Sequence, residues 1–102
     1  MDQDLEKINQ LRQEIDSYDK QIVALLNKRA QCADGIGKIK RRLNMPVYVP
    51  TREEEVIRLV VKSNPGPLSK AAIARLYERI IDESRRLERE NFELRSMQGD
   101  SA

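Results

Sequence analysis

Residues 4–43, DLEKINQLRQEIDSYDKQIVALLNKRAQCADGIGKIKRRL, decide the fold of this 102-residue chain. Apolar side chains recur there in two series with a spacing of seven residues, which is the heptad pattern of a long helix. The two series are Ile8, Ile15, Ile22, Ile36 and Leu43, and Leu11, Tyr18, Leu25, Cys32 and Ile39. Arg29 occupies a position of the first series, and Arg12 and Lys40 share a heptad position beside the apolar face. The pattern predicts one helix over about residues 4–44, with charges in and beside its apolar face.

The length of this helix indicates a partner. At 1.5 Å per residue, 40 helical residues would extend for roughly 60 Å, whereas a compact 100-residue domain has a radius of gyration of roughly 13 Å. The apolar face therefore needs a cover, and a second copy of the chain is the simplest one. We expect one helical domain over residues 1–96, a homodimer, and a disordered tail over residues 97–102.

Two proline-containing segments divide the rest of the chain. Pro46 and Pro50 should end the long helix. Thr51 and Glu54 match a capping box, with Thr51 as the N-cap of a short helix over about residues 52–63.

The second break, Asn64-Pro65-Gly66-Pro67, precedes Ser69, the expected N-cap of a third helix that ends near Arg95. The predicted fold is all-α, with one very long, one short and one long helix. Gly35 and Gly37 indicate a bend, a close approach or tight helix packing in the long helix.

Composition excludes several classes of function. Basic and acidic residues are interspersed and the net charge is only +2, so we expect no nucleic-acid partner. Arg41 and Arg42 are interpreted as solvated cations at the negative end of the helix dipole. The absence of histidine removes the commonest general base and metal ligand, and we expect no metal and no cofactor.

Three further features of the sequence bear on the location of the protein. The single cysteine, Cys32, cannot form an intrachain disulfide, and its heptad position predicts a buried, inert thiol. The acidic start MDQDLEK is unlike a signal peptide, and no run of eighteen apolar residues could span a bilayer. We expect a cytoplasmic protein without a membrane partner.

Charges also interrupt the apolar face of the third helix. From Tyr77 and Ile81, helical steps lead to Ser84 and Glu88. Taken singly, Arg29, Lys40 and Glu88 each have an ordinary explanation, such as an interhelical ion pair or a polar residue that sets the register of a coiled coil. Together they indicate a cationic cavity, which a small dicarboxylate could neutralise through bidentate arginine contacts.

An ordered set of segments is spread over about residues 5–90: LRQEID (11–16) with Asp19, LLNKR (25–29), GKIK (37–40), Pro46, Pro50, Arg52-Glu53 and LYERIIDES (76–84). Together these segments resemble the AroQ-type chorismate mutases, and in particular the mutase domain of bifunctional mutase-prephenate dehydratases, although no dehydratase sequence follows. The resemblance implies an intertwined homodimer without a cofactor that rearranges chorismate to prephenate in aromatic amino-acid biosynthesis.

The resemblance also implies a role for each site residue. Arg12 from the partner and Arg29 in cis would bind the substrate carboxylates. Lys40 and Glu88 would donate hydrogen bonds to the breaking ether oxygen, and Lys40 would also contact a carboxylate. The remaining positions are Glu53, which would accept from the ring hydroxyl, Arg52, which would support the site electrostatically, and Ser84, which would contact a carboxylate.

Two positions depart from the commonest pattern of that family. Val49 stands where an aspartate is frequent, and a backbone group can replace that contact. Glu88 stands where many members carry glutamine, and glutamate donates a hydrogen bond only when protonated. The chain would therefore need a neutral Glu88 for activity.

Two other functions fit parts of the pattern. An isochorismate-pyruvate lyase of the same fold would also use Arg29 and Lys40, although Arg52-Glu53 favours the mutase. A non-catalytic coiled-coil module would explain the heptads, but not Arg29 within them or the polar turn at Ser84.

Overall fold

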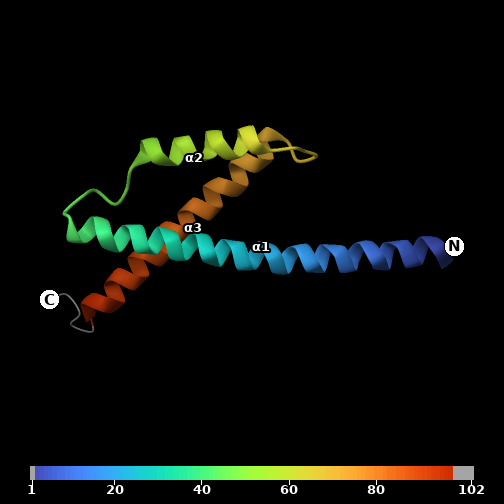
Figure 1. Cartoon of the computed structure of the whole chain (residues 1–102), viewed down its shortest axis with the longest axis horizontal. Helices are drawn as coiled ribbons and strands as arrows, with labels where there is room; N and C mark the ends of the chain where they lie inside the picture. Colours follow the sequence, from blue (N-terminus) through green and yellow to red (C-terminus); the bar gives the residue numbers. More distant parts are fainter. Residues whose placement is uncertain (1, 98–102) are drawn as a thin grey trace. The chain divides into compact units, whose positions relative to one another are not determined.

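The computed structural model describes residues 2–97, and the chain divides after Gln31 into two compact units. Across these residues there are three helices and no strand: α1 spans Asp2–Arg42, α2 spans Pro50–Ser63 and α3 spans Lys70–Met97 (Figure 1). The prediction of one very long, one short and one long helix is confirmed. Met97 is the last residue of α3, and the rest of the tail predicted for residues 97–102 lies outside the described residues.

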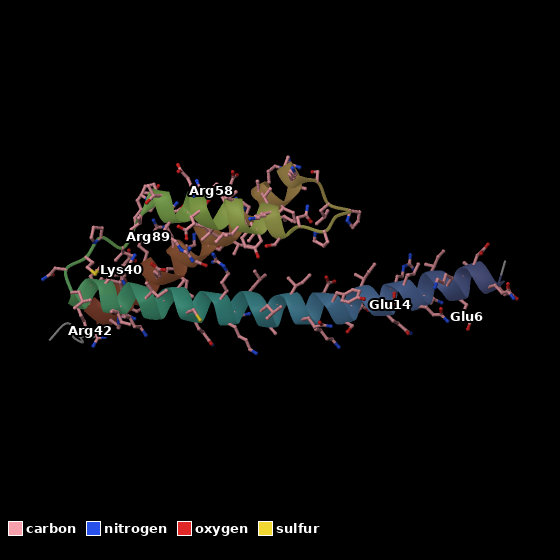
Figure 2. All side chains as sticks on the ribbon, turned by 45° about the horizontal axis from the view of Figure 1, so that its top comes forward. Glu6, Glu14, Lys40, Arg42, Arg58 and Arg89 are labelled. Carbon is pink, nitrogen blue, oxygen red and sulfur yellow. The ribbon has the colours of Figure 1, made fainter. Side chains whose placement is uncertain are left out.

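The first unit, described from residue 2 to residue 31, is the N-terminal part of α1. Asp2 and Asp4 lie in its first turn, where carboxylates interact favourably with the positive end of the helix dipole. Figure 2 shows Glu6 and Glu14 farther along this part. Its large apolar side chains are between 38% and 63% exposed, so most of the predicted heptad face is open to solvent in a single chain. These side chains are Leu5, Ile8, Leu11, Ile15, Tyr18, Ile22, Val23, Leu25 and Leu26.

The second unit, described from residue 32 to residue 97, contains the end of α1 together with α2 and α3. α2 and α3 contact each other, and the apolar residues of each recur at helical spacing. Ile81 of α3 is only 7% exposed. The half-buried apolar residues include Val56, Ile57, Val60 and Val61 on α2, and Ile73, Tyr77 and Ile80 on α3.

The N-terminus of α2 differs from the prediction. Val49 is the N-cap and makes no side-chain cap hydrogen bond, so the predicted cap at Thr51 is wrong. The carbonyl oxygen of Val49 instead accepts from the amides of Arg52 and Glu53, at 3.0 and 3.3 Å. Pro50 is the first helical residue, where its fixed φ suits the helix and its missing N–H needs no partner. Pro50 therefore starts α2 as well as separating it from α1.

The other predicted helix start agrees with the structure. Ser69 Oγ accepts a hydrogen bond from the Ala72 amide at 3.0 Å, which confirms Ser69 as the N-cap of α3. In the preceding turn, Asn64 Oδ1 accepts from the Gly66 amide at 3.1 Å. Gly66 has φ +79°, a backbone conformation that glycine adopts without strain.

The C-terminus of α1 is closed by a Schellman-type cap. The amide of Met45 donates to the Lys40 carbonyl at 2.8 Å, and the amide of Asn44 donates to the Arg41 carbonyl at 3.2 Å. Asn44 adopts the left-handed conformation, with φ 56°, that this cap requires. The cap fixes the last turn of α1, which carries Lys40.

Cys32 is exposed, contrary to the prediction of a buried thiol. Ile36 and Ile39, which belong to the same two heptad series, are also exposed, at 55% and 47%. The prediction assumed a covered heptad face, and within a single chain this part of the face is uncovered.

Candidate functional site

Gly37, near the end of α1, is buried and lies close to α3. A Cβ atom built on Gly37 would lie 3.2 Å from Glu88 Oε2 and 3.3 Å from Glu88 Cδ. Around Gly35, by contrast, no atom of the described chain lies within 4 Å of such a Cβ. α1 remains helical through both glycines, so the structure favours the close-approach interpretation for Gly37 alone. The missing side chain lets the Glu88 carboxyl group lie against α1.

The surroundings of Glu88 favour its neutral form. Burial is the largest influence and raises the pKa of the Glu88 carboxyl group above its usual value, because a charged carboxylate loses solvation there. The negative charge of Asp34 raises this pKa further, whereas Arg41, Lys40 and Arg85 lower it, and the net direction is upward. Glu88 is thus poised to carry a proton nearer to neutral pH than an exposed glutamate would be.

Lys40 supplies a cation to the same region. It is half-buried in the last turn of α1, where Figure 2 labels it, and it is near enough to Glu88 to lower the pKa of that carboxyl group. A half-buried ammonium group and a protonated Glu88 would give two hydrogen-bond donors of different charge in one region.

Asp34 is a second acidic group on this face of α1. It is buried, and its Oδ2 atom forms an ion pair with Lys38 Nζ at 3.3 Å. Its Oδ1 atom has no hydrogen-bond partner within residues 2–97. The negative charge of Asp34 is therefore only partly compensated where it acts on Glu88.

Arg41 is not the solvated cation that the sequence predicted. Its Cζ atom lies 4.4 Å from the centroid of the Phe92 ring, a cation–π contact between α1 and α3. Its Nη1 atom is buried, without a hydrogen-bond partner in the described part of the chain. The prediction considered the helix dipole alone, and the packing of α3 against α1 draws this guanidinium group inward.

A pocket of about 650 Å³ opens beside Glu88. It is lined by Arg41, Val47, Tyr48, Arg79, Asp82, Glu83, Arg85, Arg86, Glu88 and Arg89. Five of these side chains are arginines and three are acidic. Arg89 is labelled on α3 in Figure 2. The excess of guanidinium groups suits an anionic ligand.

Glu53 and Arg85 connect α2 to α3. Glu53 Oε2 lies 3.5 Å from Arg85 Nη1, and Arg85 Nη2 donates to Asp82 Oδ1 at 3.1 Å. The guanidinium group of Arg85 also lies over the Tyr48 ring, 4.3 Å from its centroid. The hydrogen bond to Asp82, with Glu53 and Tyr48 adding to it, raises the pKa of Arg85 despite the opposing effect of burial.

Of the other predicted site residues, two lie in the second unit and two lie in the first. Ser84 is buried, one turn before Glu88 on α3. Arg52 is exposed and forms an ion pair with Glu55 one turn farther along α2. Arg12, which is exposed, and Arg29, which is half-buried, lie in the first unit. The second unit therefore brings together Lys40, Glu88 and, through Arg85, Glu53.

Sequence analysis missed Arg85. It lies four residues after Ile81 and three before Glu88, so helical periodicity alone places it beside the polar part of the α3 face. Its contacts with Glu53 and Tyr48 depend on how α2 and the preceding loop pack, which periodicity does not give.

Residues 2–97 contain no group of three or more histidine, cysteine, aspartate or glutamate side chains that could hold a metal ion. None of the helices described has the combination of length and apolar composition needed to cross a membrane. What the pocket offers a ligand is arginine side chains and a carboxyl group of raised pKa, which Lys40 also influences.

Comparison with known proteins finds chorismate mutases both among family models and among curated relatives. The family model described as chorismate mutase type II matches residues 11–89. A bifunctional chorismate mutase/prephenate dehydratase from Aquifex aeolicus is 37% identical over 89 residues, which cover 83% of this chain and 25% of that protein. The protein of the same name from Neisseria gonorrhoeae is 41% identical over 78 residues, which cover 76% and 21%. The chain thus spans about a quarter of the length of these curated relatives.

A solved structure is also similar to most of this chain. Chorismate mutase (form II) from Thermus thermophilus superposes with a TM-score of 0.79 at 35% identity. The match covers 81% of this chain and 94% of the other.

Proposed function

This chain belongs to the chorismate mutase type II family, and we propose that it rearranges chorismate to prephenate in the route to phenylalanine and tyrosine. The observation that carries this proposal is the placement of Glu88, whose pKa is raised, in a pocket rich in arginine and within the electrostatic influence of Lys40. The reaction is a unimolecular rearrangement in which a C–O bond breaks as a C–C bond forms. It needs no base, nucleophile or metal, and this matches a site without histidine.

Orientation of the substrate is the first requirement. The enolpyruvyl side chain must fold over the ring, and two arginines that grip the two carboxylates can hold it there. We assign these roles to Arg29 in cis and to Arg12 of the partner subunit. Ser84 would contact a carboxylate as well, while Glu53 would accept a hydrogen bond from the ring hydroxyl with Arg52 supporting it electrostatically.

Stabilisation of the ether oxygen is the second requirement. Negative charge grows on this oxygen as its bond to the ring breaks, and donors that are already in place lower the barrier. Lys40 would donate from its ammonium group and Glu88 from its protonated carboxyl group. Burial of Glu88, reinforced by Asp34, supports this assignment because both raise the pKa of Glu88.

A homodimer would complete the site. The large apolar side chains between Leu5 and Leu26 are mostly half or more exposed, and a matching heptad face on a second copy would bury them. Each fully buried side chain of this size is worth about 1.5–3 kcal/mol, so the shared face could supply a stable interface. The same association would bring Arg12 of each copy to the other.

Mixing purified chain with chorismate tests the proposal. We expect the absorbance of chorismate to fall and prephenate to accumulate, while a Lys40→Ala sample at the same concentration reacts far more slowly. Unchanged chorismate would contradict the proposal. Formation of salicylate and pyruvate from isochorismate, without prephenate from chorismate, would identify a lyase instead.

A further inference from the structure

Arg85 contacts three different segments of the second unit. Its Nη1 atom lies 3.5 Å from Glu53 Oε2 on α2, and its Nη2 atom lies 3.1 Å from Asp82 Oδ1 on its own helix. The flat face of the guanidinium group lies over Tyr48, in the loop between α1 and α2. One side chain therefore connects α2, α3 and the loop that separates α1 from α2.

The three contacts use different parts of the guanidinium group and so restrict its orientation. Two nitrogens face two carboxylates, and the ring contact restricts the plane in which both nitrogens lie. The Asp82 contact spans one turn of α3 and fixes Arg85 locally. Arg85 in turn meets Glu53, whose side chain is only 25% exposed. The Glu53 carboxylate is thus contacted from α3.

We propose that Arg85 is a positioning residue, which fixes the Glu53 carboxylate and the Tyr48 loop at the edge of the pocket that contains Glu88. This inference rests on the proposed function, in which Glu53 accepts a hydrogen bond from the substrate ring hydroxyl. Arg85 itself need not touch the substrate. Its effect on the reaction passes through Glu53 and through the shape of the pocket wall at Tyr48.

Arg85 has a second effect that a purely structural residue would lack. Its charge lowers the pKa of Glu88, together with Arg41 and Lys40 of α1, against the upward influence of burial and of Asp34. Among the groups that line the pocket from the loop, Tyr48 is titratable and lies against Arg85 itself. Loss of the Arg85 charge should therefore keep Glu88 protonated to higher pH while Glu53 becomes less well placed.

Two substitutions separate these effects. Arg85→Gln removes both the charge and the two-nitrogen contact. Arg85→Lys keeps the charge but cannot hold Glu53, Asp82 and the Tyr48 ring in the same plane. The matched control is Arg58→Gln, which removes a charge from an exposed position on α2 outside the pocket lining (Figure 2). Thermal unfolding of each variant establishes that it is folded before its kinetics are compared.

The readout is kcat/KM for chorismate across a pH series. We expect both Arg85 variants to lose about 10- to 100-fold at the optimum, as catalytic groups misplaced by about an ångström do. In Arg85→Gln the alkaline fall in activity should also move to higher pH, whereas in Arg85→Lys it should stay near that of the parent. Arg58→Gln should match the parent in both respects.

Other outcomes overturn the inference. A parent that converts chorismate while both folded Arg85 variants match it would exclude the positioning role and leave the proposed function intact. An equal loss in Arg58→Gln would show a general effect of charge and would also overturn it. A parent without turnover would overturn the proposed function and this role together.

Discussion

The two units of the chain use the same kind of helical periodicity with opposite results. In residues 2–31 the apolar heptad positions are exposed, with Ile15 at 54% and Leu25 at 63%. In residues 32–97, α2 and α3 contact each other and Ile81 is buried at 7%. The second unit thus brings several candidate site residues together within one chain, whereas the first presents an exposed apolar face.

Introducing charges on the exposed heptad face of the first unit should have the largest effect on dimerisation and turnover. Ile15→Asp together with Ile22→Asp places two carboxylates on the heptad face of α1. We expect a folded chain that no longer dimerises. Turnover should fall by at least about 1000-fold, because each site loses the arginine that the partner supplies and the partner surface that covers it. Any weakening of the hydrogen bonds to the ether oxygen adds to this loss. Light scattering for mass and the chorismate assay for turnover check this result.

The control for that experiment adds the same charge elsewhere on the helix. Gln13→Asp with Asn27→Asp lies on a different heptad position, away from both apolar series. This variant should keep the mass and turnover of the parent. A charged Ile15/Ile22 variant that remained a fully active dimer would show that the exposed face is not the interface.

Lys40→Ala tests the second unit directly and should have the next largest effect. Removing a preorganised donor to the ether oxygen should lower turnover by about 100- to 1000-fold. The melting temperature should change little or rise, because one cation leaves a region that also contains Arg41 and Arg85. An unfolded Lys40→Ala variant would instead indicate a structural role for Lys40.

The pH dependence of activity tests the proposed role of Glu88 as a protonated donor. The protonated form is the proposed donor, so activity should be present below the pKa of Glu88 and should be lost as pH rises through it. Asp34→Asn removes a negative charge that raises this pKa, and the loss should therefore begin at lower pH. Arg41→Gln removes the strongest cationic influence and should move the loss to higher pH.

Two variants serve as controls for the pH series. Glu88→Gln carries a permanent donor and should show no such alkaline loss. Glu78→Gln, which removes an exposed carboxylate of α3, should leave the pH profile unchanged. An Asp34→Asn profile identical to that of the parent would exclude Asp34 as an influence on Glu88.

The glycine pair should give the smallest effect. Alanine at position 37 places a methyl group 3.2 Å from Glu88 Oε2, so the carboxyl group must shift and turnover should fall by a few-fold. Alanine at position 35 meets no atom of the described chain within 4 Å and should leave turnover unchanged. Its helix propensity should add about 1 kcal/mol to the free energy of unfolding. Chemical denaturation and the chorismate assay, applied to both variants, check the difference.

Most of the fold followed from local signals in the sequence. The heptads of α1, the proline-containing breaks and the Ser69 cap each act within a few residues, and their prediction is confirmed. The Thr51 cap failed because two local signals competed there, and Pro50 in the first helical position prevailed.

Less of the site could be predicted, because its electrostatics depend on tertiary packing. Helical spacing placed Ser84 and Glu88 on one face of α3, but not the Asp34 charge beside Glu88. Arg41 lies over Phe92, and Arg85 joins Glu53 only because α3 packs near the end of α1 and against α2. The roles of Arg12 and Arg29 stay predictions, since both residues lie in the first unit and Arg12 would act in the site of a second copy of the chain.

Subunit complementation tests most directly whether the exposed unit of one chain completes the site of another. Arg12→Ala and Lys40→Ala chains, each nearly inactive alone, are mixed at equal concentration and allowed to exchange subunits. Half of the dimers should then be heterodimers with one intact site of two, which restores about a quarter of the parent activity. A heterodimer verified by mass that remains inactive would contradict the shared site.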